Sequence, residues 1–212
     1  DYLLSRCFEM MVEDGNLEVL KLLSSTSTEI AQGEVLQLQH KGEVDMLEET
    51  YFKITSSKTA ALFSAATKVG AILGEKKAKY KEALEFYGKN IGLTFQIADD
   101  TLDYNSDLKS FGKEMGNDFF EGKVTLPIIL LCQKISNSEK KILKNLFYKK
   151  KREKEELNYV LNLIKKNNII KDCYKKADHF INLASNALSV FEDSKEKKIL
   201  KNLTTFSIER NF

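Results

Sequence analysis

The stretch FQIADDTLD, residues 95–103, decides the fold, because it places three carboxylates at the end of an apolar helical run. In a helix that turns about 100° per residue, Gln96, Asp99 and Asp103 share one stripe, and Asp100 lies about a quarter turn away. Such a stripe can bind a cation. Taken alone, the pattern fits a solvated acidic face equally well, since charged helix faces are common.

Apolar residues surround these acids along the helix expected over residues 83–104, among them Ile91, Ile97 and Leu102. They favour burial of most of the helix, so we expect the carboxylates to line a pocket. Proteins usually hold Mg²⁺ through one or two carboxylates, while substrate phosphates and waters complete the octahedron. The sequence therefore predicts a magnesium and phosphate site.

The composition predicts a single all-α domain over residues 1–212. Hydrophobic residues make up 42% of the chain, which contains one proline and ten glycines, and Leu, Lys, Glu and Ala are abundant. The net charge is only +2, from 33 basic and 31 acidic residues, so we expect no nucleic-acid partner. Lysines 149–151 with Arg152, and the lysines within 195–201, are expected on solvated faces or at a helix junction.

Three widely spaced cysteines, Cys7, Cys132 and Cys173, lie in apolar helical patterns. They indicate buried thiols and a reducing, cytoplasmic compartment. No apolar run approaches the roughly 20 residues that a transmembrane helix needs. A targeting segment ahead of Asp1 stays an open possibility.

Apolar periodicity and capping residues predict a helix over residues 1–14 that is buried almost all round, and a second over 16–41 with Asn16 as its N-cap. A third is expected over 45–73, capped by Asp45. The helix that carries the acids starts at about residue 75. Pro127 is expected in the first turn of the next helix, and amphipathic helices follow over residues 138–150, 153–166, 169–193 and 195–209.

Two further segments carry basic residues in positions suited to a phosphate ligand. Lys58 and Thr59 stand among small residues in SSKTAALFSAA, although a lysine there can equally extend to solvent along the surface. The loop over residues 105–122 is rich in glycine and, with Lys123 directly after it, supplies lysines that could close over a phosphate. A plain surface loop would look the same.

In this order, Lys58-Thr59, FQIADDTLD and GKEMGNDFFEGKVTLP (residues 112–127) make the chain resemble a trans-isoprenyl diphosphate synthase of the long-chain polyprenyl type. The segments DYLLSRCF at the start, GEVLQLQ (residues 33–39) and SIERNF at the end extend the resemblance over essentially the whole chain. It implies an all-helical fold around a deep central cavity. It also implies a reaction in which a magnesium-bound allylic diphosphate ionises and isopentenyl diphosphate attacks the cation.

The same resemblance assigns roles to the acids. Asp99 would bind magnesium directly, and Asp100 and Asp103 would support the cluster or bind through water. Asp118 would hold a magnesium-bound water. The expected cofactor is therefore Mg²⁺.

It also assigns the substrate contacts. Three lysines would contact the leaving diphosphate: Lys58, Lys113 and Lys123. Thr59 and Gln96 would stabilise the nascent cation, Phe95 would border the isopentenyl site, and Gln37 would line the allylic side. The product would be a long all-trans polyprenyl diphosphate of the sort used for quinone side chains. A homodimer is expected through residues of about 1–41.

One departure separates the chain from this family pattern. The first aspartate-rich motif of the family, and the pair of arginines after it, precede the region that DYLLSRCF resembles, and the sequence has neither. We therefore expect the C-terminal two-thirds or so of a synthase, which could be inactive alone. The alternatives are a noncatalytic subunit of a heteromeric synthase, a class I terpene cyclase, and a bare helical scaffold.

Overall fold

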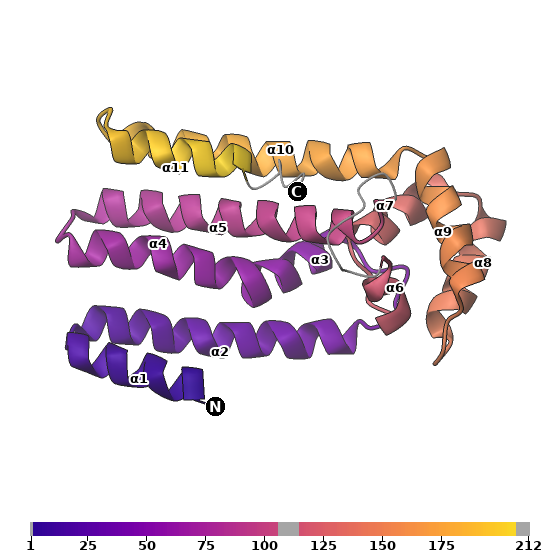
Figure 1. The fold of residues 1–212 in the computed structure, drawn as a ribbon, viewed down its shortest axis with the longest axis horizontal. Helices are drawn as coiled ribbons and strands as arrows, with labels where there is room; N and C mark the ends of the chain where they lie inside the picture. The colour runs from indigo at the N-terminus through magenta and orange to yellow at the C-terminus, as the bar shows by residue number, and fades with distance from the viewer. Residues whose placement is uncertain (1, 106–114, 207–212) are drawn as a thin grey trace.

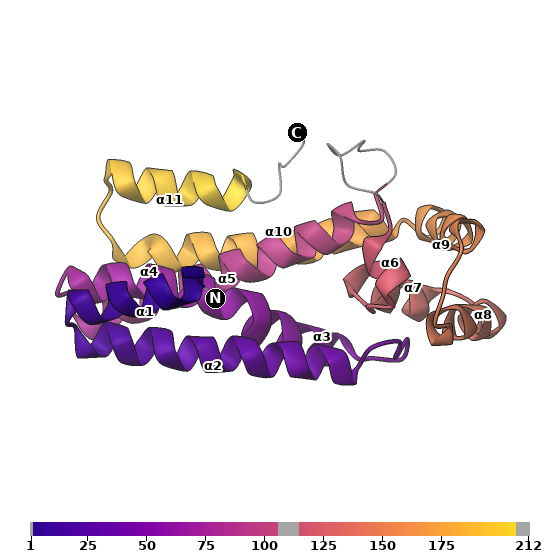
Figure 2. The same cartoon turned by 60° about the horizontal axis from the view of Figure 1, so that its bottom comes forward.

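The computed structural model describes residues 2–105 and 115–206, which form helices joined by turns, with no β-strand in these two ranges. The long helices run side by side along one axis, and α8 and α9 lie across one end of this bundle (Figures 1 and 2). The all-α prediction is confirmed.

The helices have the following bounds in chain order: α1 (Tyr2–Asp14), α2 (Leu17–Gln39), α3 (Glu48–Thr55), the π-helix η1 (Ser56–Ala60), α4 (Ala61–Leu73), α5 (Ala78–Leu102), α6 (Asn117–Glu121), α7 (Leu126–Lys134), α8 (Asn137–Tyr148), α9 (Lys154–Lys166), α10 (Ile169–Ala187), the 3₁₀-helix η2 (Leu188–Val190) and α11 (Lys195–Phe206). The helix α5 packs along both α4 and α10, so the acidic stretch ends the central helix of the bundle.

The two N-terminal helices confirm one expectation and correct another. The side chain of Asn16 accepts hydrogen bonds from the amides of Glu18 and Val19, at 2.9 and 3.2 Å, and so caps α2 as predicted. The expectation that α1 is buried almost all round is wrong for this chain. Met11 is its one buried residue among those whose side chains are described, because α1 packs mainly against α2.

The third helix begins later than predicted and is interrupted. Leu47 occupies the N-cap position of α3, whereas Asp45 pairs with Lys140 at 3.0 Å and with Lys144, so its predicted capping role is wrong. A turn of π-helix, η1, separates α3 from α4. Single π-turns inside α-helices often mark functional sites, and this one contains Lys58.

Glycines on α5 permit its close packing against the segment before it. A Cβ atom at Gly92 would lie 2.5 Å from the Cα atom of Ala60, and one at Gly88 would lie 2.4 Å from the carbonyl oxygen of Phe63. Real Cβ atoms do not come this close to backbone, so only glycine fits. Both positions therefore allow α5 to pack tightly against α4 and η1.

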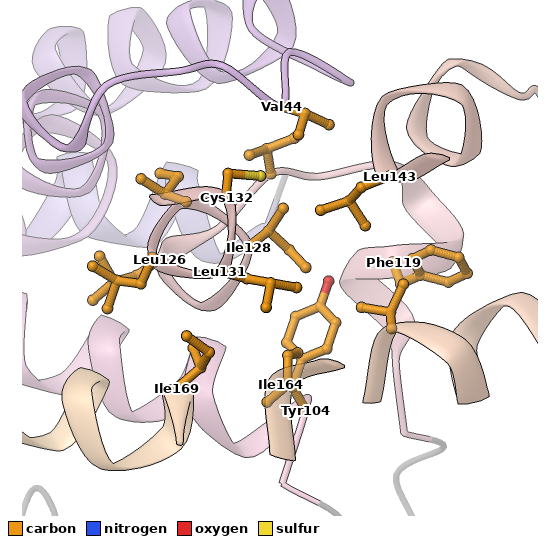
Figure 3. Packing of buried hydrophobic residues seen from close by; sticks show 14 of the residues in the cluster. Val44, Tyr104, Phe119, Leu126, Ile128, Leu131, Cys132, Leu143, Ile164 and Ile169 are labelled. Atoms are coloured by element: carbon orange, nitrogen blue, oxygen red, sulfur yellow. The ribbon is translucent and has the colours of Figure 1, made fainter. Parts of the chain in front are cut away.

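The main hydrophobic core surrounds α7, whose residues from Leu126 to Cys132 are all buried (Figure 3). Pro127 lies in its first turn, as predicted, where the missing amide hydrogen costs nothing. Side chains from α8, α9, α10 and the α2–α3 connection pack around it. Burying each large aliphatic side chain contributes about 1.5–3 kcal/mol, so this core fixes α7 and the turn before it.

The structure also bears on the three cysteines, on the basic residues 149–152 and on membrane-spanning helices. Cys132 and Cys173 are buried as expected, but Cys7 is exposed on α1, which corrects the expectation for that thiol. Lysines 149–151 are exposed, whereas Arg152 is buried at the junction of α8 and α9. Within the two described ranges, no helix is both long and apolar enough to cross a membrane.

Candidate active site

A cavity of about 260 Å³ lies where the C-terminal end of α5 meets η1, α3 and the turn before α7. Its lining includes eight of the residues predicted for the site: Gln37, Lys58, Thr59, Gln96, Asp99, Asp100, Asp118 and Lys123. The structure thus brings eight predicted side chains from four separate segments around one space. The C-terminal end of α5, which lines the cavity, lies near α6 and α7 (Figure 1).

Close backbone packing on both sides holds the π-helix that carries Lys58 and Thr59. On one side, a Cβ atom at Gly33 of α2 would lie 2.6 Å from the amide nitrogen of Lys58. On the other, Gly92 of α5 packs against Ala60. The two glycines let three segments approach closely, and this approach places Lys58 and Thr59 on the cavity wall.

A chain of hydrogen bonds crosses the cavity wall from η1 to α3. The hydroxyl of Thr59 donates to Oε1 of Gln96 at 2.8 Å, and Nε2 of Gln96 donates to Oδ1 of Asp100 at 2.7 Å. The hydroxyl of Tyr51 donates to Oδ2 of Asp100, also at 2.7 Å. The Gln96 amide is therefore fixed in orientation, and both Asp100 oxygens have a donor.

Asp103 makes a different set of contacts from its neighbours. Its carboxylate accepts from the backbone amides of Asn117, at 3.1 Å, and Asp118, at 2.9 Å, and its carbonyl accepts from Gly116. It is not among the cavity-lining residues. In this structure Asp103 holds the start of α6, which in turn places Asp118 at the cavity, and its role as a metal ligand stays a prediction.

The two cavity lysines are held by carboxylates at the rim. Lys58 pairs with Glu34 at 2.6 Å and donates to Oε1 of Gln37, also at 2.6 Å. Lys123 pairs with Glu121 at 2.6 Å and lies 3.8 Å from Asp118. Both lysines are partly exposed, so their ammonium groups can exchange a carboxylate for another anion.

Burial raises the pKa of the acids in the cavity. The pKa of Asp100 rises to about 8, chiefly because the side chain is buried and secondly because Asp118 lies nearby. Burial, followed by the charge of Asp103, raises the pKa of Asp118 to about 6. The carboxylates are thus crowded in a poorly solvated space, where a cation would offset their mutual repulsion.

The donor set fits a cation that also takes ligands from phosphate and water. Within the described ranges, no three His, Cys, Asp or Glu side chains are arranged to hold a metal by themselves. Asp99, Asp100 and Asp118 nevertheless line one cavity together with two lysines. Mg²⁺ commonly binds through one or two carboxylates and completes its shell with phosphate and water, and this site offers such a set.

Besides Asp103, two predicted site residues are not among those that line the cavity. Phe95 is partly buried and packs against Phe63, with ring centroids 5.3 Å apart, and it is not a lining residue. Lys113 lies outside the described residues. Their predicted roles stay predictions.

Tyr51 and Thr125 were not predicted as site residues, although both line the cavity. A signal was present, because a buried tyrosine normally needs a partner for its hydroxyl, and Tyr51 stands seven residues before Lys58, on the same helical face. Thr125 gave no such signal, since a threonine before a helical proline reads simply as an N-cap.

The fold and this cavity define a class: an all-α protein whose central helix ends in a carboxylate-lined cavity with lysines at its rim, suited to an anionic phosphate ligand and a divalent cation. Comparison with known proteins agrees. Residues 1–164 match the family described as polyprenyl synthetase. The chain belongs to the polyprenyl synthetase family.

Individual relatives show how far the similarity extends. The chain is 35% identical over 210 residues to an all-trans-nonaprenyl-diphosphate synthase (geranyl-diphosphate specific) of Rhodobacter capsulatus, covering 99% of this chain and 64% of that protein. A crystal structure of a decaprenyl diphosphate synthase from Rhodobacter capsulatus matches with a TM-score of 0.92 and 34% identity, over 100% of this chain and 65% of that one.

A polyprenyl synthase from Caulobacter crescentus, crystallised with calcium and isoprenyl diphosphate, matches with a TM-score of 0.95 and 33% identity, again over 100% of this chain and 65% of that one. The chain therefore spans slightly less than two thirds of the length of these relatives. The match includes the cavity described above, since it covers the whole chain.

Proposed function

We propose that this chain forms the diphosphate-binding part of a trans-prenyltransferase that condenses isopentenyl diphosphate with an allylic diphosphate into a long-chain all-trans polyprenyl diphosphate. The observation that carries the proposal is the convergence of Asp99, Asp100 and Asp118 with Lys58 and Lys123 on one cavity. The relatives named as nonaprenyl and decaprenyl diphosphate synthases support the long-chain product class.

Lys58 and Lys123 would bind the diphosphate of the allylic substrate and neutralise the charge that develops on it as the carbon–oxygen bond breaks. Such stabilisation is strong when the charged groups are placed beforehand in a site that excludes water. Magnesium held at Asp99, Asp100 and Asp118 would supply further charge neutralisation on the leaving diphosphate. Asp103 is proposed to support these ligands through its contacts with the start of α6.

Thr59 and Gln96 would act on the allylic cation. The Gln96 amide is held at both ends, by Thr59 and Asp100, so its dipole is fixed before substrate binds. A fixed carbonyl dipole stabilises positive charge without having to reorient during the reaction. Attack by the isopentenyl double bond, followed by loss of a proton, then completes condensation; Phe95 and Gln37 are proposed to border the isopentenyl and allylic sites.

The test is magnesium-dependent transfer of labelled isopentenyl diphosphate into extractable lipid. The chain would be assayed alone and joined to the portion of a relative that it does not span. We expect activity in at least the joined form, and its loss by at least 100-fold in Asp99→Asn. Failure of the joined form to transfer label, while the relative itself is active, would contradict the proposal.

Self-association through α1 and α2 is part of the proposal. Several large apolar side chains of these helices are exposed: Tyr2, Leu3, Phe8, Met10, Val12, Leu17, Val35 and Leu38. Exposed apolar patches of this kind commonly mark interfaces. Sedimentation at micromolar concentration should give a dimer, and Phe8→Glu with Met10→Glu should shift it to monomer; a wild-type monomer would exclude this interface.

The three cysteines support a reducing, cytoplasmic compartment, which we include in the proposal. Cys7, Cys132 and Cys173 are all free thiols, and two of them, Cys132 and Cys173, are buried in the main core. Thiols in this state are typical of proteins from reducing compartments.

A further inference from the structure

Arg152 is a buried cation in the α8–α9 connection, 8% exposed. Its Nε atom donates to the carbonyl of Leu146 at 3.1 Å, one terminal nitrogen donates to the carbonyl of Phe147, and the other donates to the carbonyl of Phe120 at 3.1 Å. No carboxylate in the described part of the chain lies within ion-pair distance of it, although ion pairs are frequent elsewhere. Its partners are backbone carbonyls from two different elements.

These contacts have a clear physical basis at α8. Leu146 and Phe147 belong to the last turn of α8, whose carbonyls lack the usual partner four residues on and carry the negative end of the helix dipole; the carbonyl of Leu146 also accepts from the amide of Lys149 at 3.3 Å. The guanidinium also lies over the rings of Phe119 and Phe147, at 5.9 and 5.5 Å from their centroids. Such stacking favours a cation in an apolar setting.

The third contact reaches the segment that supplies the active-site cavity. Phe120, whose carbonyl accepts from Arg152, stands between Asp118 and Lys123, and both of those residues line the cavity. The backbone of Gly122 passes so close to Arg152 that a Cβ atom there would lie 2.6 Å from a guanidinium nitrogen. Gly122 has a φ of +74°, which glycine adopts without strain.

Gly122 is also held from the opposite side. Its carbonyl accepts from the amide of Gly42 at 3.0 Å, and the amide of Lys123 donates to the carbonyl of Asp118 at 2.9 Å. The segment from Asp118 to Lys123 is therefore fixed between the α2–α3 connection and Arg152 (Figure 2 shows α6 between α5 and the end formed by α8 and α9). Asp103 also holds the start of this segment through the amides of Asn117 and Asp118, and without the guanidinium one of these supports is lost.

We propose that Arg152 is a positioning residue for the active site: by joining the end of α8 to α6, it holds Asp118 and Lys123 at the cavity without contacting substrate. The link to substrate binding rests on the proposed function. The mechanical link, in which Arg152 fixes the segment from Asp118 to Lys123, does not.

Two measurements on the full chain separate these parts. The first is the rate of hydrogen exchange at the backbone amides of Gly42 and Lys123, relative to the rate at Ile97 of α5. The second is the affinity for inorganic pyrophosphate in the presence of Mg²⁺, measured by calorimetry. The variants are Arg152→Met, which keeps the apolar stem, and Arg152→Lys, which keeps the charge but not the fork of donors. Val160→Ala, at a fully buried position of α9, is the control for lost stability.

We expect Arg152→Met to speed exchange at Gly42 and Lys123 at least tenfold relative to Ile97, and to weaken pyrophosphate binding at least fivefold. Val160→Ala should change neither. If Arg152→Met does not fold, the same comparison is made with Arg152→Lys. For that variant we expect exchange at least threefold faster and pyrophosphate binding at least threefold weaker.

An unchanged exchange ratio would overturn the proposal, as would equal effects in Val160→Ala. Faster exchange with unaltered pyrophosphate affinity would overturn the link to the site. If the wild-type chain binds no pyrophosphate, the proposed function fails, and the exchange ratio alone still decides whether Arg152 holds this segment.

Discussion

At the scale of single residues, the carboxylates paired with Lys58 and Lys123 would compete with the proposed diphosphate ligand. Glu121 pairs with Lys123 at 2.6 Å, and its side chain is more than half exposed. An exposed ion pair of this kind contributes about 0.2–1 kcal/mol. Because a diphosphate must displace Glu121 from Lys123, removing the carboxylate should favour binding by that amount.

Glu121→Gln should therefore tighten binding of magnesium pyrophosphate by up to about fivefold. Calorimetry at fixed ionic strength measures this change in affinity. Glu153→Gln, which removes an exposed partner of Lys151 away from the cavity, is the control and should have no effect. Weaker binding in Glu121→Gln would show that Glu121 helps to hold the ligand instead.

Two buried tyrosines give opposite expectations for the same chemical change. The hydroxyl of Tyr51 donates to Asp100, whereas that of Tyr104 has no hydrogen-bond partner among the described residues. Tyr51→Phe leaves a buried carboxyl oxygen without its donor and should lower the free energy of unfolding by about 1–3 kcal/mol. Tyr104→Phe should leave it unchanged or raise it.

Urea denaturation of both variants measures the difference. The two tyrosines are matched in burial, at 3% and 2% exposed, so lost packing cannot account for a gap between them. Equal changes in the free energy of unfolding would contradict the hydrogen bond from Tyr51 to Asp100.

At the scale of elements, the close packing of α5 against η1 determines the position of Lys58 and Thr59. Gly92→Ala would place a methyl group 2.5 Å from the Cα atom of Ala60. Overpacking of this kind costs about 1–3 kcal/mol, and the displaced η1 should also weaken pyrophosphate binding. Thermal unfolding and calorimetry measure the two effects.

Gly70→Ala is the matched control for that substitution. Gly70 lies inside α4, and a Cβ atom there meets nothing within 4 Å. Alanine should therefore stabilise the helix by about 0.5–1 kcal/mol and leave ligand binding unchanged. Destabilisation by Gly70→Ala comparable to that of Gly92→Ala would indicate that helix propensity, and not packing against η1, governs both positions.

Also at this scale, local sequence signals predicted the helices well and their interruptions poorly. Asn16 and Pro127 mark helix starts by chemistry that acts within a few residues, and the structure has these starts as predicted. The π-helix at η1 left no local mark, because it depends on the approach of α2 and α5. Asp45 was wrongly predicted to cap the third helix, because its carboxylate instead pairs with Lys140 and Lys144, which are distant in sequence.

At the scale of the whole molecule, the sequence predicted most of the residues that line the cavity but not which contacts each of them makes. Asp99, Asp100 and Asp103 follow one another on a helix, and the stripe pattern groups Asp103 with Asp99. In the structure Asp103 instead accepts from the start of α6. That contact depends on where α6 lies relative to the end of α5, which helical periodicity cannot predict. Arg152 lies at a helix junction, which was one of the two expected places, but its burial was not predicted, because its partners are backbone carbonyls, which sequence does not distinguish.

The carboxylates and lysines around this cavity are proposed to form one metal-dependent diphosphate site. The most direct measurement is calorimetric titration of the chain with inorganic pyrophosphate, with and without Mg²⁺, alongside Asp99→Asn, Lys123→Met and the exposed control Asp193→Asn. We expect binding to one site that Mg²⁺ strengthens at least tenfold, that both cavity variants weaken at least tenfold, and that Asp193→Asn leaves unchanged. Binding that is indifferent to Mg²⁺, or equal in Asp99→Asn and wild type, would contradict the account.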